Sequence, residues 1–526
     1  MQDSLFHSLI DIRDSKAGLL GKADLVLERA RWATSIFERY DSQMTIKIVQ
    51  AVSNAAFEMA EEFAGKAVEE TGFGIKEHKK IKNEMASRYL FNYYVEQDFV
   101  NPRVNEKKKI VEIPRPAGVI FALIPSTNPI ATVNYKIILA LLTRNAIVIS
   151  PHPAAQSCSC EAVQRLIHTA EKAGAPEGII QVLESPTIPM VEAFMTSPKT
   201  NVILATGGTP MVRSAYSSSN PAIGVGPGNI PVYVDSTANI KMAAQRIIKS
   251  KSFDNSVLCT NESVLITVPE VDNGLKLALK ANKAHICSKE ETDLLRRFLF
   301  HPGGFNVEAI GRSATWIANE CGIRLPSETK VLITPISQIG VEEVLSKEKL
   351  CPVLSYHVAN DEKQAFAQAR AVLRLSGAGH SAAIHAESEE TILNFSGQVE
   401  VYRVVVNAPS SQGAAGLDTN LAPTFTVGTG YFGRSSIGDN IGPQHLVHWT
   451  KVAYHRDENV AFGNYHKIGK DFPGPLPEAE IGGLGLRSQK QPAKITQSNI
   501  ESLEIRNEIR RLISEELKDL LGKNNG

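Results

Sequence analysis

The sequence lacks an excess of either charge, a hydrophobic run of membrane length and closely paired cysteines. Lysine plus arginine number 56, as do aspartate plus glutamate, so no overall field favours nucleic acid or an anionic membrane. An apolar stretch such as residues 137–142 is interrupted at Thr143, well before the length that spans a bilayer. The opening residues lack a basic flank and a sustained apolar core. We therefore expect a cytoplasmic protein with no nucleic-acid and no membrane partner.

The six cysteines are also spread through the chain, at positions 158, 160, 259, 287, 321 and 351. In a chain of 526 residues this spacing predicts reduced thiols and no disulfide framework. Cys158 and Cys160 are close together, but no second pair or histidine cluster follows them, so we predict no metal site. A composition of 43% hydrophobic and 21% charged residues is typical of a soluble globular enzyme with two or three domains.

Continuous apolar runs at residues 119–124 and 146–149 are separated by a helical pattern at about 135–142. A further helix near 162–173 and strands at 178–183 and 201–205 continue the alternation. Strands that are apolar throughout and alternate with helices indicate a parallel sheet covered on both faces. The fold class is therefore α/β, with a doubly wound dinucleotide-binding domain over residues 1–238, although no Gly-x-Gly-x-x-Gly fingerprint follows the first strand. The first hundred residues are expected to be packing helices with no obvious chemistry.

The rest of the chain divides by composition. A second αβ unit over 239–430 is expected to be the catalytic domain, and 431–470 to return to the cofactor domain. Residues 471–497, rich in proline, glycine and polar side chains, are predicted to be a flexible linker. After it, Ser498 and Glu501 form a capping box that opens an amphipathic helix over 498–521, which needs a partner for its apolar stripe.

Cys259 lies in a polar turn, with Glu262 three residues on and the apolar run 264–266 of a predicted core strand behind it. A thiol that is partly exposed near groups favouring the thiolate is a candidate nucleophile. A buried, inert cysteine would give the same local pattern, because free cysteine is among the most buried residue types. The choice between them depends on other motifs.

Those motifs are Pro-Ser-Thr-Asn-Pro at 125–129, Ala-Thr-Gly-Gly at 205–208 and Gly-Val-Gly-Pro-Gly-Asn at 224–229. Ser-Pro-His-Pro at 150–153, Glu-Lys-Leu-Cys-Pro-Val at 348–353, Gly-His-Ser at 379–381 and Asn-Ala-Pro-Ser-Ser-Gln-Gly at 407–413 follow in order. Between about residues 20 and 460 the chain resembles the CoA-dependent acylating branch of the aldehyde dehydrogenase superfamily. The resemblance implies that superfamily's fold and an oxidoreductase that uses NAD or NADP, with NAD as the default, and CoA as co-substrate.

By the same resemblance, Cys259 is the nucleophile, and Asn128 with the backbone N–H of Cys259 would stabilise the oxyanion of the adduct. His380 would take a proton from the CoA thiol or assist Cys259, and the resemblance does not choose between these roles. Glu348 would hold the nicotinamide ribose, and small residues at 206–208 would let backbone amides approach a phosphate. The implied cofactor-binding residues are Ser126, Thr127, Ser150, His152, Pro153, Thr206, Gly207, Gly208, Gly226 and Glu348.

The segment 224–229 departs from the hydrolytic relatives, which carry a Glu-Leu-Gly-Gly motif there whose glutamate activates water. Here it holds no acid. A thioester that water attacks slowly can persist until the thiol of CoA arrives, so the sequence favours acyl transfer to CoA over hydrolysis.

Several alternatives and partners remain open. A small uncharged aldehyde such as acetaldehyde or propionaldehyde is favoured, but Arg144 or Lys136 could serve sulfoacetaldehyde or a semialdehyde. A non-acylating aldehyde dehydrogenase, a glutamyl phosphate reductase and a structural shell-associated protein with a degenerate site are the rival classes. By resemblance, edge strands at 109–114 and 446–454 would form an arm that pairs subunits into homodimers or homotetramers. The helix at 498–521 resembles encapsulation peptides, which implies a bacterial microcompartment shell protein or a co-encapsulated enzyme as partner.

Overall fold

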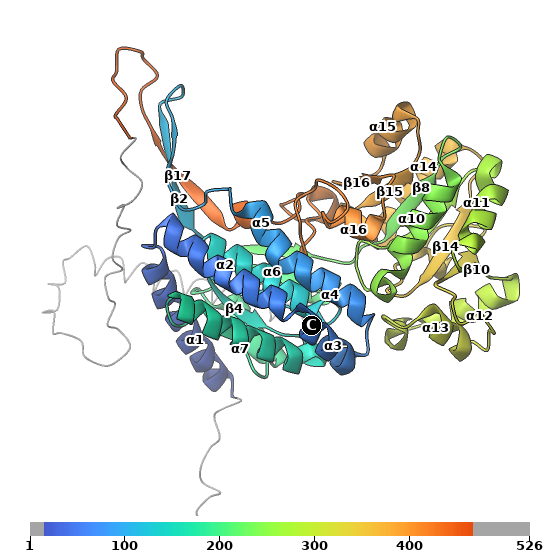
Figure 1. The fold of residues 1–526 in the computed structure, drawn as a ribbon, viewed down its shortest axis with the longest axis horizontal. Helices are drawn as coiled ribbons and strands as arrows, with labels where there is room; N and C mark the ends of the chain where they lie inside the picture. Colours follow the sequence, from blue (N-terminus) through green and yellow to red (C-terminus); the bar gives the residue numbers. More distant parts are fainter. Residues whose placement is uncertain (1–14, 466–526) are drawn as a thin grey trace, which may run out of the picture. The chain divides into compact units, whose positions relative to one another are not determined.

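Residues 15–465 are described by the computed structural model (Figure 1). The predicted linker at 471–497 and the predicted helix at 498–521 lie outside the described residues. Among residues 15–465, no helix combines the length and the apolarity that crossing a membrane requires.

The first half of the chain is built on a five-stranded parallel sheet, in the order β5-β4-β3-β6-β7. Its strands are β3 (Val119–Leu123), β4 (Ala146–Ser150), β5 (Ile180–Val182), β6 (Val202–Thr206) and β7 (Ala222–Val225). Every residue of β3 and β4 is buried, as the continuous apolar runs predict. The chain leaves β3 in one direction toward β5 and returns on the other side at β6. Ligands bind at such a reversal, beyond the carboxyl ends of the strands.

The helices of this half are α1 (Lys16–Phe37), α2 (Ser42–Glu58), α3 (Ala60–Thr71), α4 (Lys76–Glu84), α5 (Leu90–Tyr94), α6 (Pro129–Leu142), α7 (Gln156–Ala173), α8 (Ile188–Thr196) and α9 (Thr209–Ser217). Helix α6 is buried along its whole length and begins at Pro129, not near residue 135 as predicted. The fixed backbone angle of proline suits the first position of a helix. Asn128 is therefore held at the point where the chain enters α6.

The second half is built on a seven-stranded parallel sheet, in the order β10-β13-β14-β9-β8-β15-β16. The strands are β8 (Ile230–Val234), β9 (Glu262–Thr267), β10 (Ala284–Ile286), β13 (Val331–Pro335), β14 (Val353–Val358), β15 (Ala382–His385) and β16 (Val404–Val406). Strand β8 pairs with β9 and β15, so this half starts at Ile230 and not at the expected residue 239. Its helices are α10 (Ile240–Ser252), α11 (Pro269–Ala281), α12 (Lys289–Leu299), α13 (Ala314–Glu320), α14 (Glu362–Val372), α15 (Glu389–Gln398) and α16 (Ser410–Ala414), and β11 (Phe300–His301) and β12 (Gly304–Phe305) form a short hairpin.

A separate three-stranded antiparallel sheet joins β1 (Arg103–Asn105), β2 (Ile110–Pro116) and β17 (Val447–Ala453). Strand β2 pairs with β17 from Ile110 opposite Ala453 to Pro116 opposite Val447. Figure 1 shows β2 and β17 side by side, although more than 300 residues separate them in the sequence. The two segments predicted at 109–114 and 446–454 therefore form one antiparallel pair.

Candidate active site

One cavity of about 460 Å³ collects nearly all the residues that the sequence singles out. It is lined by twelve of them: Ser126, Thr127, Asn128, Ser150, His152, Pro153, Thr206, Gly207, Gly208, Gly226, Cys259 and Glu348. The two sheets face this cavity with opposite ends of their strands. The residues from the first sheet follow the carboxyl ends of β3, β4, β6 and β7, whereas Cys259 precedes the amino end of β9.

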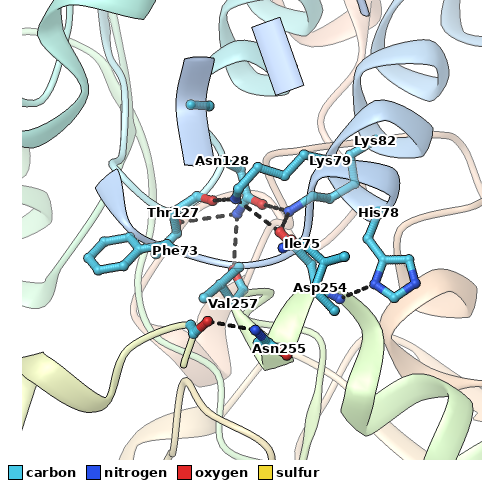
Figure 2. A network of polar contacts seen from close by, with 12 residues as sticks. Phe73, Ile75, His78, Lys79, Lys82, Thr127, Asn128, Asp254, Asn255 and Val257 are labelled. Carbon is cyan, nitrogen blue, oxygen red and sulfur yellow. Dashed lines mark hydrogen bonds and ion pairs between the residues drawn. The ribbon is translucent and has the colours of Figure 1, made fainter. Parts of the chain in front are cut away.

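The backbone in front of Cys259 adopts a rare conformation. Asp254, Asn255 and Ser256 all have left-handed backbone angles, with φ of 50°, 50° and 66°. Residues other than glycine seldom adopt this region, so the surrounding structure must hold the turn in place. Figure 2 shows two of these contacts: the backbone N–H of Asp254 donates to His78 Nδ1 at 2.9 Å, and Asn255 Nδ2 donates to the carbonyl of Gly311 at 2.8 Å.

Cys259 itself is half-buried and lines the cavity. Burial, followed by the nearby Glu348 carboxylate, raises the pKa of the Cys259 thiol to about 12, while Arg403 lowers it. Gly228 packs against the cysteine so tightly that a Cβ at that position would lie 2.1 Å from the Cys259 carbonyl oxygen. Without a bound ligand, the thiol is therefore protonated near neutral pH, and the backbone on which it sits is closely confined.

Asn128 presents its amide nitrogen to the cysteine loop. Its Nδ2 donates to the carbonyl of Val257 and to Thr127 Oγ1, both at 3.2 Å (Figure 2). Val257 precedes Cys259 by two residues, so the side-chain donor of Asn128 lies beside the loop that carries Cys259. This is where a donor for an oxyanion formed on Cys259 is needed.

His380 is the one predicted site residue that does not line the cavity. It is fully buried before β15, and its Nδ1 lies 3.1 Å from Ser381 Oγ. Its Nε2 has no hydrogen-bond partner within residues 15–465. A Cβ placed on Gly228 would lie 3.3 Å from His380 Cδ2, so the imidazole sits directly behind the loop that confines Cys259. Burial, and next the Arg403 guanidinium, lower the pKa of His380 to about 3, which keeps the imidazole neutral.

The other wall of the cavity has the features of a dinucleotide site. Helix α9 begins right after Gly208, so its first backbone N–H groups face the cavity end of β6, where a phosphate would be stabilised. A Cβ on Gly207 or Gly226 would meet no atom within 4 Å, so both glycines leave open space. Glu348 Oε1 accepts from the Gly228 N–H at 3.0 Å, and burial raises the pKa of this carboxyl to about 8. These residues fit phosphate and hydroxyl groups of a nucleotide.

Arg144 and Lys136, considered above for an anionic substrate, are committed elsewhere. Lys136 is fully buried and donates to the carbonyls of Leu123 and Leu204 at 2.7 and 2.8 Å. Arg144 donates to backbone carbonyls at the end of α1, among them that of Tyr40 at 3.2 Å. Neither lines the cavity, and none of its described lining residues is a lysine or an arginine.

The first hundred residues, expected to be packing helices with no obvious chemistry, include in α4 two buried charged residues. Lys79 and Lys82 of this helix are buried and form ion pairs with Asp254, in the turn before Cys259. Their spacing of three residues on one helix face is the only sequence signal of this arrangement, and in the charged run 76–82 it looks like a solvated surface.

The cysteines at 158 and 160 have ordinary packing roles, since their thiols lie 3.6 and 3.8 Å from the carbonyls of Ala155 and Leu183. Elsewhere in residues 15–465, ligand-type atoms of His285, Cys287 and Glu291 lie within 4.8 Å of one another. Glu291 already accepts from the Ser288 N–H at 2.8 Å in the capping box of α12 and lies 2.9 Å from His285 Nε2. These contacts account for the cluster without a metal.

Comparison with known proteins gives consistent matches. The sequence model described as "Aldehyde dehydrogenase family" matches residues 14–291. The aldehyde-alcohol dehydrogenase of Clostridium acetobutylicum is 38% identical over 459 residues, which are 86% of this chain and 53% of that protein. The chain thus spans about half the length of this and similar two-function relatives.

Solved structures agree with this match. An acetylating aldehyde dehydrogenase from Geobacillus thermoglucosidasius is 37% identical with a TM-score of 0.83, over 85% of this chain and 100% of that one. Two propionaldehyde dehydrogenases are each 27% identical over 84% of this chain and 98% of theirs, with TM-scores of 0.76 and 0.75. One is from the fucose utilisation bacterial microcompartment of Clostridium phytofermentans, and the other, from Rhodopseudomonas palustris, contains CoA and an acylated cysteine. With its two parallel sheets and one shared cavity, the chain belongs to the aldehyde dehydrogenase family.

Proposed function

We propose that this protein is a CoA-acylating aldehyde dehydrogenase, which oxidises a short-chain aldehyde to an acyl-CoA with NAD(P)+ as the oxidant. The observation that carries the proposal is the shared cavity, in which Cys259 and the amide of Asn128 face loops that fit a dinucleotide. The loop 224–229 contributes no acid to this cavity. The names of the acetylating relative and of the CoA-bound propionaldehyde dehydrogenase support the same reaction.

The chemistry follows from the positions of these groups. Cys259 Sγ adds to the aldehyde carbon, and the oxygen of the thiohemiacetal is stabilised by the Asn128 amide and the backbone N–H of Cys259. When bound, the nicotinamide supplies the acceptor for the hydride. Loss of that hydride leaves a thioester on Cys259, and the sulfur of CoA attacks its carbonyl, releasing acyl-CoA and the free thiol. The net reaction consumes one aldehyde, one CoA and one NAD(P)+ and gives one acyl-CoA, one NAD(P)H and one proton, which comes from the thiol of CoA.

Among the aldehydes, the geometry favours an uncharged one such as acetaldehyde or propionaldehyde. An anionic sulfonate or carboxylate buried without a cation would be unstable, and the described lining of the cavity offers no lysine or arginine. The polar groups of the lining are hydroxyls, amides, the His152 imidazole, the Cys259 thiol and the Glu348 carboxyl. We propose NAD as the default nucleotide, with Glu348 at the nicotinamide ribose and residues 206–208 at the phosphates.

The experiment that tests this function compares products with and without CoA. Initial rates over a panel of short aldehydes, including sulfoacetaldehyde and succinate semialdehyde, are followed by nucleotide reduction and by mass analysis of the acyl product. Acyl-CoA formed only when CoA is present supports the proposal. Free acid formed at the same rate without CoA would instead favour a non-acylating dehydrogenase, with Glu348 as the candidate base.

We propose that His380 assists the exchange of the acyl group with CoA, because its unpartnered Nε2 lies behind the loop next to Cys259. His380→Ala should slow the CoA-dependent half-reaction more than nucleotide reduction in a single turnover without CoA. Rapid mixing resolves the two steps. Equal losses in both steps would indicate that His380 activates Cys259 and not CoA. No loss in either step would indicate that His380 only contributes to packing.

We propose that β17 and β2 form the arm that pairs subunits into dimers or tetramers. Six of the seven residues of β17 are at least partly exposed, which leaves this strand free to contact another subunit. Light scattering of the purified protein tests this, and a monomer at micromolar concentration would contradict it.

We further propose that the C-terminal segment addresses a cytoplasmic enzyme to a bacterial microcompartment. The support is the capped, amphipathic sequence pattern at 498–521 and the microcompartment origin of one relative. Deleting residues 478–526 should leave aldehyde oxidation nearly unchanged and abolish co-purification with shell proteins. Loss of activity or of the native oligomer in the truncated protein would support an oligomerisation helix instead.

A further inference from the structure

Three segments meet around Asn128 and Asp254 in a buried polar network (Figure 2). Helix α4 supplies Lys79 and Lys82, the loop after β3 supplies Thr127 and Asn128, and the left-handed turn before Cys259 supplies Asp254. The two lysine side chains are each 4% exposed and the aspartate side chain is not exposed at all. Charged groups this deeply buried destabilise the folded state unless each is paired, so loss of any one of these contacts is expected to be destabilising.

The contacts of Lys82 connect the donor with the nucleophile. Its ammonium donates both to Asn128 Oδ1 and to Asp254 Oδ2. Because Lys82 is a pure donor, it selects the oxygen of the Asn128 carboxamide and turns the nitrogen the other way. That nitrogen is the atom that reaches the Val257 carbonyl, beside Cys259.

Asp254 fixes the other side of the network. Its Oδ1 accepts from the Ile75 N–H at 2.7 Å, and its Oδ2 accepts from Lys79 Nζ at 3.0 Å as well as from Lys82. A side chain does not fit at Gly74, because a Cβ there would lie 2.1 Å from Asp254 Oδ1. The turn that leads to Cys259 is thereby anchored to the helix that orients Asn128.

We propose that Lys82 is a positioning residue that holds the Asn128 carboxamide with its N–H₂ group toward the oxyanion. Through Asp254, Lys82 also fixes the position of this carboxamide relative to the turn that leads to Cys259. The proposal rests on the function proposed above, because it assigns Asn128 as the oxyanion donor. Without Lys82, only the Nδ2 contacts with Val257 and Thr127 described here hold the carboxamide, and nothing selects its oxygen; a carbonyl oxygen turned toward the oxyanion would repel it.

Lys79 provides the matched control. It lies on the same face of α4, is equally buried and pairs with the same Asp254 oxygen. Its other contact is the backbone carbonyl of Thr127 at 3.1 Å, and no contact with the Asn128 side chain is described for it. Lys79→Met therefore removes a buried ammonium from the same network without releasing the carboxamide.

The test is a double-mutant cycle on the rate of nucleotide reduction in a single turnover without CoA. We expect Lys82→Met to slow this step about tenfold or more in the wild-type background, a fraction of the loss from deleting an oxyanion donor. In the Asn128→Ala background we expect no further loss, because Lys82 then has no carboxamide to orient. Lys79→Met should have a smaller effect that is the same in both backgrounds.

Lys82→Gln is the second variant, since a glutamine amide still donates to Asn128 Oδ1 and should recover part of the rate. Nucleotide binding and thermal unfolding are measured for every variant. Equal losses from Lys82→Met in both backgrounds, or no loss in either, would overturn the positioning role. An inactive wild-type enzyme would contradict the proposed function, whereas an active wild type with additive losses contradicts only the role of Lys82.

Discussion

Cys259→Ala is expected to abolish CoA-dependent aldehyde oxidation, leaving less than about a hundredth of the wild-type rate, because the thiolate forms both the adduct and the thioester. Cys259→Ser should behave in the same way, since a serine hydroxyl ionises much less readily than a thiol and is a far weaker nucleophile. The measurement is nucleotide reduction with saturating aldehyde and CoA. Nucleotide binding should persist in both variants, because the loops at 150–153 and 206–208 do not depend on the thiol.

A matched control is available in Cys160, a cysteine that does not line the cavity. Its thiol is partly exposed on α7, so Cys160→Ala should retain wild-type activity. If the Cys259→Ala enzyme were as active as the Cys160→Ala control, the reaction would not pass through a covalent adduct on Cys259.

Asn128→Ala should lower kcat by about a hundredfold to a thousandfold, the usual result of removing one preorganised oxyanion donor. The KM for the aldehyde should change little, since the amide contributes mainly once the carbonyl oxygen gains charge. Steady-state kinetics with CoA in excess measures both constants.

Alkylation of Cys259 by iodoacetamide distinguishes this explanation from a displaced nucleophile. The alkylation rate of the Asn128→Ala enzyme should match that of the wild type across pH, because burial and Glu348 set the pKa of the thiol and both remain. A large change in that pH profile, or a rate of oxidation within about threefold of wild type, would contradict the oxyanion role.

Periodicity and motifs in the sequence were sufficient to predict the strands of the two sheets, but not the long-range contacts that assemble the candidate site. The runs at 119–124 and 146–149 are apolar throughout and predicted β3 and β4 closely, because strands buried on both faces leave a strong signal. The boundary at 239 was placed late, since nothing local distinguishes β8 from the strands of the first sheet; only its pairing with β9 and β15 assigns it to the second.

Among the site residues, sequence motifs pointed to those in glycine- and proline-rich loops at strand ends. They did not point to Lys79 and Lys82, whose role depends on the approach of Asp254 from a segment more than 170 residues away. The depth of His380 was equally unpredictable, because a histidine after a glycine turn is compatible with a surface position. Long-range contacts of this kind leave no periodic trace in a single sequence.

The packing of the loop 224–229 also bears on how such an enzyme could change its chemistry. A Cβ on Gly224 would lie 2.7 Å from Val212, and one on Gly228 would meet the Cys259 carbonyl at 2.1 Å. Only at Gly226, of the three glycines, is there open space for a side chain. An evolutionary route from acyl transfer toward hydrolysis that adds a carboxylate at one of these glycines is therefore sterically open at Gly226 alone. A side chain at Gly228 would have to displace the backbone of Cys259, and one at Gly224 would have to displace Val212 and Tyr216.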